Sequence, residues 1–288
     1  MCAVDRRPYH GDRAVLATMH GKEAVITPLA ERFLGARLRP TGGLDTDAFG
    51  TFTRDVARAG SQLDAARAKI SAVFDMQPDL RLGLASEGSF GPHPYLPFCA
   101  LEREIVLLND RGADLELIGQ PSTCNTNFAH MTVTDVASGL FFAKRAVFPS
   151  HGIIVMGCRE DGPAHDVALI KSAENWDDLA SSLDRIVSAN GSAFIETDMR
   201  AHRNPLRMRA IKRATIDLIR RARTPCPECE RPGYAVTEHL AGLPCSWCSE
   251  PTLLTRAEVL SCKGCGLRVE RPVAMTHADP VNCGGCNP

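Results

Sequence analysis

The first 120 residues alternate between short apolar runs and longer stretches whose apolar residues recur every three or four positions. The short runs predict buried strands, and the longer stretches predict amphipathic helices. One helix is expected to end at Gly35, and another is expected to begin at Ser61, because Ser61 and Asp64 have the spacing of a capping box. The predicted order is strand 13–18, helix 20–35, strand 36–40, helix 61–75, strand 81–86 and a β-hairpin over 104–120 that turns at Arg111 and Gly112.

The alternation continues up to residue 223 and then stops. Since strands and helices alternate and the hairpin must be antiparallel, the pattern predicts an α/β fold with a mixed sheet and flanking helices. We place a domain boundary near Thr224 and Pro225, which divides the chain into an α/β domain over 1–223 and a small domain over 224–288. The later predicted elements are helix 131–146, strand 151–157, helix 176–190, strand 192–198 and a basic helix over 204–223 with Pro205 in its first turn.

The small domain contains four Cys-x-x-Cys pairs in succession. Two cysteines separated by two residues fit one tight turn, or knuckle, and two knuckles complete a tetrahedral four-cysteine zinc site. The sequence therefore predicts a zinc-ribbon-like domain with two structural zinc ions, in which a hairpin formed by 252–260 and 267–273 surrounds the third knuckle. The eight predicted ligands are Cys226, Cys229, Cys245, Cys248, Cys262, Cys265, Cys283 and Cys286.

Other uses of these cysteines fit the sequence less well. A disulfide framework requires an oxidising compartment, and no export signal is seen at the N-terminus. A redox Cys-x-x-Cys motif normally occurs once and lies beside a βαβ pattern, and iron–sulfur sites usually have other spacings. Neighbouring, interleaved and nested pairings of the knuckles all satisfy the spacing, so the sequence leaves open which knuckles share a zinc ion.

Composition and charge exclude several classes of protein. Apolar residues make up 44% and charged residues 23% of the chain, and the net charge is −1, which describes an ordinary globular protein without a general attraction to nucleic acid or anionic lipid. No apolar run approaches the length of a membrane span. We therefore expect a reduced, cytoplasmic protein without a membrane partner, and self-association is compatible with the sequence.

Three loops that follow predicted strands carry candidate chemistry, because ligands tend to gather at the carboxyl ends of strands. In the first, Gly21 and Lys22 precede a helix whose N-terminus could hold a phosphate, although a plain turn with a solvated lysine has the same pattern. The second contains Asp45 and Asp47, which suit Mg²⁺ but also suit a loop for local reasons. In the third, Glu87 is predicted to end a strand before Gly88, Gly91 and His93, which favours a metal ligand or a base over a surface turn.

Later residues add weaker candidates. Cys99 or Cys124 with His93, His130 or His151 could form a nucleophile and its base, but free cysteines are more often inert core residues. Asn125 and Asn127 could line a pocket beside them. A polar cluster that could bind an anion lies where a strand meets the basic helix, and it comprises Asp198, Arg200, His202, Arg203 and Arg207.

Two resemblances extend this interpretation. The motifs LATMHGKE, DTDAFGTFTR, GSQLDAARAK, LASEGSFGPHP, FPSHGIIV, TDMRAHRNPLRM and ADPVNCGGCNP resemble an uncharacterised bacterial family of unknown function, over nearly the whole chain. Residues 13 to about 120 are similar to the inosine triphosphate pyrophosphatase fold, including its inosine/xanthosine triphosphatase branch. The similarity rests on a strand entering a turn with Lys22, a helix with Arg67 and Lys69, and the strand and loop LGLASEGSFG with Glu87.

The second resemblance implies cleavage of a nucleoside triphosphate to a monophosphate and pyrophosphate with Mg²⁺ or Mn²⁺. It implies that Glu87, Lys22 and Asp47 are catalytic and that Asp45, Asp47 and Glu87 are ligands of the divalent ion. The usual Ser and Asn of the first turn are replaced by Ala17 and Met19, which weakens the expectation of phosphate binding. The residues expected to contact the nucleotide are Thr18, His20, Arg67, Lys69, Gly88, Ser89 and His93.

Two other functions compete with this hydrolase. The zinc domain together with the basic stretch 200–223, which has nine Arg or Lys residues, could bind a nucleic acid or a protein. Only Tyr234 and Trp247 supply aromatic rings there, so platforms for base stacking are few. In the third interpretation, the zinc domain is only a structural clamp.

Overall fold

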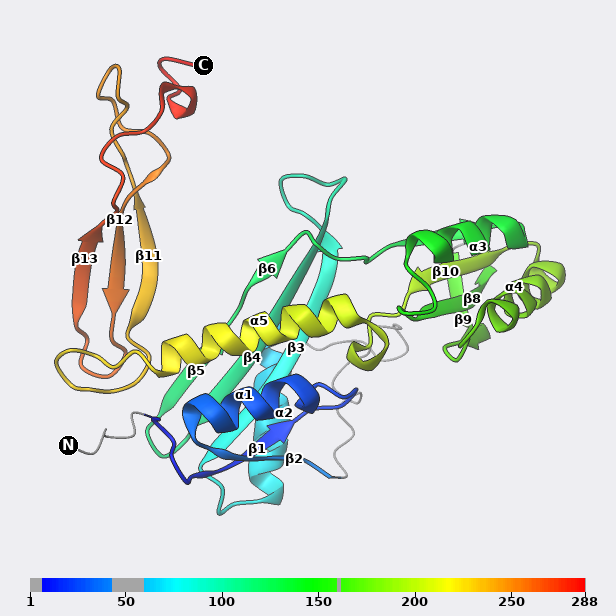
Figure 1. Cartoon of the computed structure of the whole chain (residues 1–288), viewed down its shortest axis with the longest axis horizontal. Coiled ribbons are helices and arrows are strands. Elements are labelled where there is room, and N and C mark those ends of the chain that lie inside the picture. The colour runs from blue at the N-terminus through cyan, green and yellow to red at the C-terminus, as the bar shows by residue number, and fades with distance from the viewer. Residues whose placement is uncertain (1–6, 43–59, 160–161, 288) are drawn as a thin grey trace. The chain divides into compact units, whose positions relative to one another are not determined.

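The computed structural model describes residues 7–42, 60–159 and 162–287, and Figure 1 shows its elements. The chain divides into two compact units, one covering Tyr9–Leu218 and the other containing Pro8 together with the chain from Ile219 onward. We call them the α/β unit and the zinc unit. The predicted Asp45 and Asp47 lie outside the described residues.

A six-stranded mixed sheet is the framework of the α/β unit. Its strands lie in the order β2-β1-β3-β4-β5, and β6 pairs with β4 beyond the end of β5. The strands β2, β1 and β3 are parallel, whereas β3, β4 and β5 form an antiparallel meander, which confirms a mixed sheet. The bounds are β1 Arg13–Ala17, β2 Arg37–Pro40, β3 Leu82–Pro92, β4 Ala100–Asp110, β5 Leu115–Gly119 and β6 Ser122–Thr123.

Helices pack on both faces of this sheet. The helix α2 (Gln62–Met76) covers the face formed by Val15, Ala85 and Leu107, and its Ala66 and Ile70 complete that core. The helices α1 (Glu23–Leu34) and α5 (Pro205–Ala222) bury apolar stripes of their own. A side chain at Gly119 of β5 would overlap the backbone of α5, so the glycine allows helix and strand to approach closely. The capping box of Ser61 and Asp64 is present, and Gly35 ends α1, as predicted.

The strand β3 continues beyond the position where the sequence predicts its end. Residues Glu87 to Pro92 were expected to form a turn-rich loop, but they pair in register with β4, from Glu87 opposite Ile105 to Pro92 opposite Ala100. The predicted loop is wrong because the long partner strand β4 pairs with the whole segment, which outweighs the usual tendency of glycine and proline to interrupt a strand. Glu87 therefore lies within a strand, although the adjacent β1 has already ended at Ala17, opposite Ala85.

A second sheet in the α/β unit has the order β7-β10-β8-β9, and all of its neighbouring strands are antiparallel. The helices α3 and α4 cover a core that includes Phe142, Leu179, Leu183 and Ile195. The predicted helix 131–146 is wrong in its first turn, because residues up to Val133 pair with β10 and Asp135 caps the helix. The bounds are β7 His130–Val133, α3 Val136–Arg145, β8 Ile153–Arg159, β9 Gly162–Ile170, α4 Trp176–Asn190, β10 Ala193–Thr197 and the short 3-10 helix η2 Ala201–Arg203.

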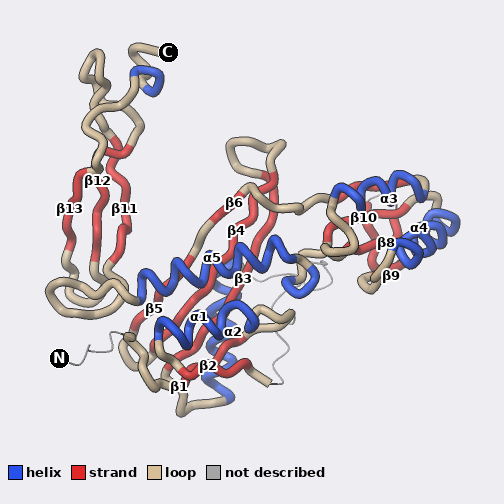
Figure 2. Tube along the Cα trace, viewed as in Figure 1, coloured by secondary structure: helices blue, strands red, loops and turns tan. Residues whose placement is uncertain are grey.

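The zinc unit is built on a three-stranded antiparallel sheet, β11-β12-β13. The strands β12 and β13 form the hairpin predicted around the third knuckle, whereas β11 was not predicted. Figure 2 shows irregular loops extending from both ends of these strands. The bounds are β11 Ala235–Ala241, β12 Thr255–Ser261, β13 Arg268–Pro272 and the 3-10 helix η3 Pro280–Asn282.

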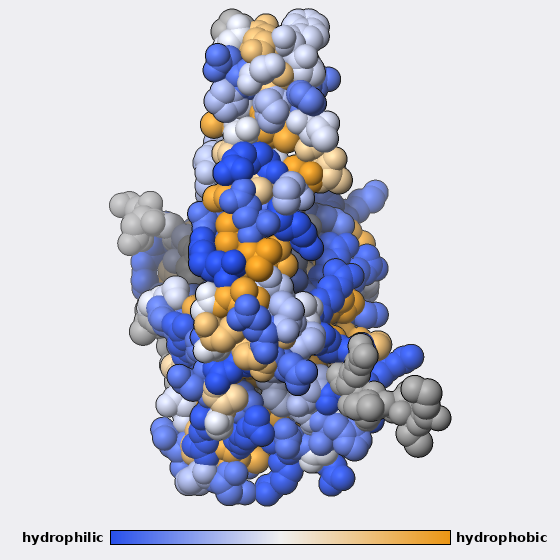
Figure 3. All heavy atoms as spheres, turned by 90° about the vertical axis from the view of Figure 1, so that its left-hand side faces the viewer, coloured by the Kyte–Doolittle hydropathy of each residue, from blue (hydrophilic) through white to orange (hydrophobic). Residues whose placement is uncertain are grey.

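Hydrophobic side chains at the surface are interspersed with polar ones on the face shown in Figure 3. No helix in the described part of the chain combines the length and the apolar character needed to cross a membrane.

Candidate functional site

The eight cysteines of the zinc unit gather into two groups of four. Cys226 and Cys229 lie with Cys262 and Cys265, and we call this group the first cluster. The second cluster contains Cys245, Cys248, Cys283 and Cys286. The first knuckle is thus paired with the third and the second with the fourth, which settles the interleaved arrangement among the three that the sequence allowed.

Sulfur distances in both clusters match a tetrahedral zinc site. Four sulfurs that each lie about 2.3 Å from a tetrahedral zinc ion are about 3.8 Å apart. Cys226 Sγ lies 3.6 Å from Cys265 Sγ, and Cys245 Sγ lies 3.9 Å from Cys286 Sγ. A disulfide would place the sulfurs at about 2.0 Å. Both clusters can therefore hold a structural zinc ion, and four thiolates leave no open coordination position for catalysis.

The first three knuckles share one backbone geometry. In each, the residue after the second cysteine donates its N–H to the carbonyl of the first cysteine at 3.0 Å, as Glu230 does to Cys226. That residue has a left-handed backbone in all three knuckles, with φ of 59° at Glu230, 63° at Ser249 and 78° at Gly266. Only Gly266 adopts this conformation without steric cost. Non-glycine residues in a strained conformation indicate that the surrounding structure fixes the turn.

Backbone N–H groups point at two of the buried sulfurs. Trp247 donates to Cys245 Sγ at 3.4 Å, and Gly264 donates to Cys262 Sγ at 3.3 Å. The N–H groups of Cys248 and Trp247 lower the pKa of the Cys245 thiol to about 7. Hydrogen bonds from the Cys265 and Gly264 N–H groups outweigh burial and lower the pKa of Cys262 to about 7. Because the thiolate is the metal ligand, these N–H groups favour the ligand form of Cys245 and Cys262.

A second group of chemically active side chains is buried in the α/β unit, near the point where β1 ends. It contains three cations and three carboxylates, all less than a tenth exposed, and we call it the charge cluster. Its members are Lys22, Lys69, Arg207, Glu87, Glu102 and Glu104.

Lys22 lies at the start of α1 and reaches the neighbouring strand. Its Nζ donates to the carbonyl of Ser86 at 2.9 Å, at a position that β1 would cover if it continued beyond Ala17. Burial, and then the charge of Arg207, lower the pKa of Lys22 to about 8. The helix α1 begins without a side-chain cap. Lys22 therefore presents a desolvated ammonium beside the N-terminus of a helix, an arrangement that suits a phosphate group.

The carboxylate of Glu87 is ion-paired with Lys69 of α2, and the two side chains are 5% and 8% exposed. Residues of β3 with odd numbers face α2, since a side chain at Gly83 would meet Ile70 and Phe74. Glu87 belongs to this set. Two residues predicted for the site, Glu87 and Lys69, are thus brought together, but a divalent cation bound at Glu87 would have to share the carboxylate with this ammonium.

On the opposite side of the same strand pair, Arg207 Nε donates to Glu104 Oε1 at 2.7 Å. Both side chains are fully buried, and Arg207 also donates to the carbonyl of Met199. The pair lies against Gly88, where a Cβ atom would overlap the Glu104 carboxylate and approach Arg207 Nη2 to 2.7 Å. Gly88 is therefore needed for the close approach of this ion pair, which differs from the predicted contact with substrate.

Glu102 precedes Glu104 by two residues in β4, so both side chains lie on the face of the strand that is directed toward Arg207. It is fully buried, and its carboxylate oxygens accept no hydrogen bond within normal geometry among the described residues. Burial, and then the charge of Glu104, raise the pKa of Glu102 to about 7, although Thr126, Arg207 and Arg213 act in the opposite direction. Sequence reasoning missed Glu102 and Glu104. The available signal was two acids at alternate positions within an otherwise apolar strand.

The other residues expected to bind a nucleotide have local partners. Arg67 forms a two-point ion pair with Glu116, at 3.0 and 2.7 Å. Ser89 donates to Gln62 at the start of α2. His93 Nδ1 accepts hydrogen bonds from the backbone N–H groups of Tyr95 and Leu96 in the tip of the β3–β4 hairpin. Arg67 and His93 are therefore engaged in structural contacts.

The turn between β1 and α1 contains Thr18 and His20. Thr18 is buried, and its hydroxyl donates to the carbonyl of Met19. His20 has a left-handed backbone, and its ring stacks on His202 with the centroids 5.2 Å apart. This contact links the turn to η2, close to the predicted polar cluster. Within that cluster Arg200 binds Asp198 through both carboxylate oxygens, so its charge is already balanced.

The contacts of these cysteines and histidines do not support a nucleophile with its base. The thiol of Cys99 hydrogen-bonds to that of Cys124, and this contact, followed by burial, raises the pKa of Cys99. A raised thiol pKa opposes nucleophilic reactivity. His151 Nδ1 lies 3.0 Å from the hydroxyl of Ser150, the adjacent residue. Asn127 bridges the carbonyl of Ala146 and the amide of Asn204.

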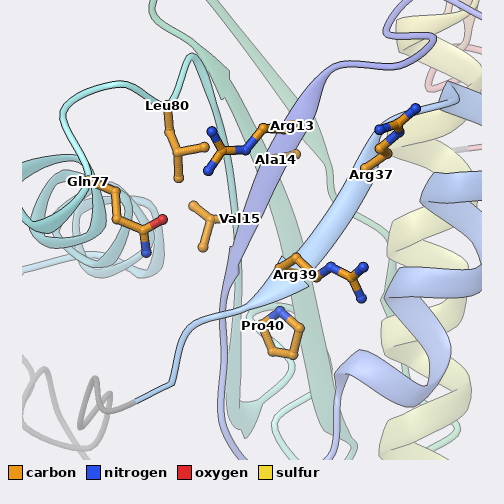
Figure 4. Close-up of a pocket in the computed structure, with 8 residues that line it drawn as sticks. All are labelled: Arg13, Ala14, Val15, Arg37, Arg39, Pro40, Gln77 and Leu80. Carbon is orange, nitrogen blue, oxygen red and sulfur yellow. The ribbon is translucent and has the colours of Figure 1, made fainter.

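A cavity of about 280 Å³ opens at the other end of β1, away from the charge cluster. Arginines of β1 and β2 line it together with Val15, Gln77 and Leu80 (Figure 4). In this view Arg13 extends toward Leu80, whereas Arg37 and Arg39 extend away from Gln77. Arg13 is also paired with Asp79 at 3.0 Å. The guanidinium groups therefore do not converge on one anion.

Comparison with known proteins identifies a family without an assigned activity. The profile of a domain of unknown function, DUF6671, matches residues 72–288. The matched part includes the C-terminal end of α2, the acidic residues of β3 and β4, and all eight clustered cysteines. No curated protein matches the chain at a significant level.

Proposed function

The chain belongs to the DUF6671 family, and we propose that its α/β unit is a metal-dependent nucleotide phosphohydrolase that cleaves nucleoside triphosphates to monophosphate and pyrophosphate. The observation that carries this proposal is the charge cluster, in which six ionisable groups are buried where β1 leaves the sheet. Burying charges is costly unless they are paired, and strongly shifted pKa values gather at functional sites. Lys22 and Glu102 show such shifts in opposite directions.

The chemistry of each residue assigns it a role. Lys22 uses one donor on Ser86 and retains others for the phosphate chain of a substrate. Glu87 is the carboxylate nearest the parallel strand ends and would accept a proton from the attacking water. Lys69 orients Glu87 through their ion pair.

A divalent cation fits the donor set. Mg²⁺ and Mn²⁺ prefer carboxylate oxygens, and the oxygens of Glu102 together with Glu104 Oε2 accept no hydrogen bond among the described residues. When bound, the cation would polarise a phosphoryl oxygen. Glu87 lies on the other face of the β3–β4 pair and would act as the base rather than hold this cation, and the expected contributions of Asp45 and Asp47 remain predictions.

The competing proposal is that the zinc unit binds nucleic acid, and the negative net charge of this unit argues against it. From Thr224 to Pro288 the sequence has five Lys or Arg and seven Asp or Glu residues. Four thiolates and one zinc ion add a net charge of about −2 at each cluster. Phosphate backbones are held by an excess of cations, which this unit lacks. Arg207 of α5 is also committed to Glu104.

The test is product analysis after incubation of the full chain with a panel of nucleoside triphosphates and Mg²⁺ or Mn²⁺. We expect pyrophosphate and the corresponding monophosphate from at least one nucleotide. Lys22→Met should raise KM, because the phosphate loses a charged donor. Asp166→Asn is a matched control, since Asp166 is paired with Arg159 on the second sheet. Absence of pyrophosphate with every nucleotide and both metals would refute the proposal.

A further inference from the structure

The chain segments around the second cysteine cluster carry large apolar side chains that are exposed to solvent. Trp247 is 78%, Leu253 94%, Met275 57% and Val281 64% exposed. Each belongs to a segment tied to this cluster. Trp247 lies inside the second knuckle, Val281 directly precedes the fourth knuckle, and Leu253 lies in the turn that returns to Leu243. We call these four side chains the apolar tip.

Backbone contacts hold the segments of the apolar tip together. Cys245 and Ala278 form a β-bridge, in which Ser246 donates to the carbonyl of Ala278 and Ala278 donates to the carbonyl of Pro244. Asn287 Nδ2 donates to the carbonyl of Val281. The apolar side chains are therefore displayed on a framework fixed by the cluster, and ordering them on binding costs little conformational entropy.

The fold of a knuckle does not require this tryptophan. At the equivalent position, immediately before the second cysteine, the other knuckles have Glu228, Gly264 and Gly285. The first and third knuckles have the same backbone hydrogen bonds as the second. Trp247 is thus not needed for the turn, and its ring is not buried within the unit. Such exposed aromatic rings are characteristic of interaction surfaces.

Charge around the apolar tip indicates the chemistry of its partner. Residues 242–255 and 273–287 contain Glu250 and Asp279 and have neither lysine nor arginine. Arg256 packs beside Gly242, but its charge is balanced by an ion pair with Glu270. A zinc ion bound by four thiolates adds a further net negative charge. The surface is thus apolar and acidic, which disfavours nucleic acid and anionic membranes, since both are polyanions. It also disfavours a symmetric contact between two copies of the tip, which would bring like charges together.

We propose that the apolar tip is a docking site for a partner protein that presents apolar side chains next to lysine or arginine. Apolar anchors would supply most of the affinity, and the opposite charges would set the orientation and the rate of encounter. This role does not depend on the hydrolase activity of the α/β unit.

Tryptophan fluorescence of the zinc-loaded full chain tests the proposal. In a Trp176→Phe background, Trp247 is the only tryptophan, because the chain has two. The probe is a synthetic peptide of alternating leucine and lysine, and the matched peptide carries glutamate in place of lysine. We expect a saturable blue shift of Trp247 emission with the lysine peptide, weaker binding at high salt, and no shift with the glutamate peptide.

Substitutions separate the tip from the rest of the unit. Leu253→Ser and Val281→Ser should each weaken binding of the lysine peptide by about tenfold, in keeping with the loss of one central anchor. Val269→Ser is the matched control, because Val269 is an exposed apolar residue of β13 outside the tip. It should leave both the affinity and the zinc content unchanged.

Several results would overturn the proposal. These are the absence of a shift with the lysine peptide, equal binding of the glutamate peptide, or binding unaffected by the tip variants. Preferential binding of oligothymidine or of phosphatidylglycerol vesicles would assign the tip to a different class of partner. Self-association that disappears in Leu253→Ser, measured by sedimentation, would make a second copy of the chain the occupant.

Discussion

Lys69 of α2 and Glu87 of β3 form an ion pair that is almost completely removed from solvent. If one side chain is removed, the charge of the other stays buried and is not hydrated. An unpaired buried charge lowers the stability of the fold more than the absence of both charges does. The pair therefore couples the packing of α2 to the orientation of the carboxylate that we assign to catalysis.

The coupling predicts a strongly non-additive response to substitution. Lys69→Met should lower the free energy of unfolding by about 3–5 kcal/mol, because Glu87 stays buried without its partner. Adding Glu87→Gln should restore a large part of that loss. Urea unfolding of the two single variants and the double variant completes the cycle. Losses that simply add would show that the two groups do not depend on one another.

Gly88 provides a test of the Arg207–Glu104 pair. A methyl group at this position would overlap the Glu104 carboxylate, so Gly88→Ala should cost about 2–4 kcal/mol through overpacking and separation of the buried pair. Gly91→Ala in the same strand is the control, because nothing lies within 4 Å of its Cβ position. That variant should be neutral to within about 0.5 kcal/mol. Equal effects at both positions in thermal unfolding would contradict the packing described at Gly88.

The raised pKa of Glu102 predicts a pH-dependent penalty. The folded protein holds this proton up to about pH 7, whereas the unfolded chain releases it near pH 4.3. The contribution of Glu102 to stability is therefore fully present below the unfolded pKa and is lost as the pH rises through about 7. Glu102→Gln removes this dependence. The free energy of unfolding of the variant, relative to that of the wild type, should therefore rise by about 2–3 kcal/mol as the pH is raised from 4 to 8.

Urea unfolding of the two zinc-loaded proteins at several pH values measures this difference. Comparison of the two proteins cancels the pH dependence of zinc binding, which both share. A difference in unfolding free energy that stays constant from pH 4 to pH 8 would mean that Glu102 titrates as an ordinary carboxylate.

Zinc stoichiometry tests the interleaved pairing of knuckles. Cys229→Ser/Cys265→Ser removes two ligands from the first cluster, so this double variant should keep one of the two zinc ions. Cys229→Ser/Cys248→Ser removes one ligand from each cluster and should reduce the content of both ions. Elemental analysis after gel filtration distinguishes the two cases. The same zinc content in both double variants would exclude the pairing of first with third and second with fourth knuckles.

Local signals in the sequence predicted the elements whose determinants are themselves local. The capping box of Ser61 and Asp64 marks the start of α2, Gly35 ends α1, and Arg111 with Gly112 turns the β4–β5 hairpin. The Cys-x-x-Cys spacing likewise predicted eight ligands, because each knuckle forms from residues adjacent in sequence.

Features that depend on distant residues were not accessible in this way. Arg207 meets Glu104 across 103 positions of sequence, and no local pattern specifies such a pair. Glu87 was expected at a strand end because Gly88 and Gly91 suggest a turn, but the register with β4 overrides that preference. Interleaving of the knuckles depends on how β11, β12 and β13 pair, which the spacing of cysteines does not determine.

Pyrophosphate release with Mg²⁺, compared between the wild type, Glu87→Gln and Asp166→Asn, tests the proposed hydrolase most directly. We expect Glu87→Gln to lower kcat by about 10²–10⁴-fold, the usual contribution of a general base, with zinc content unchanged. Asp166→Asn should retain the rate of the wild type. Equal rates in all three proteins would show that Glu87 is not the base, and no release by the wild type from any nucleotide would show that the charge cluster has no hydrolase function.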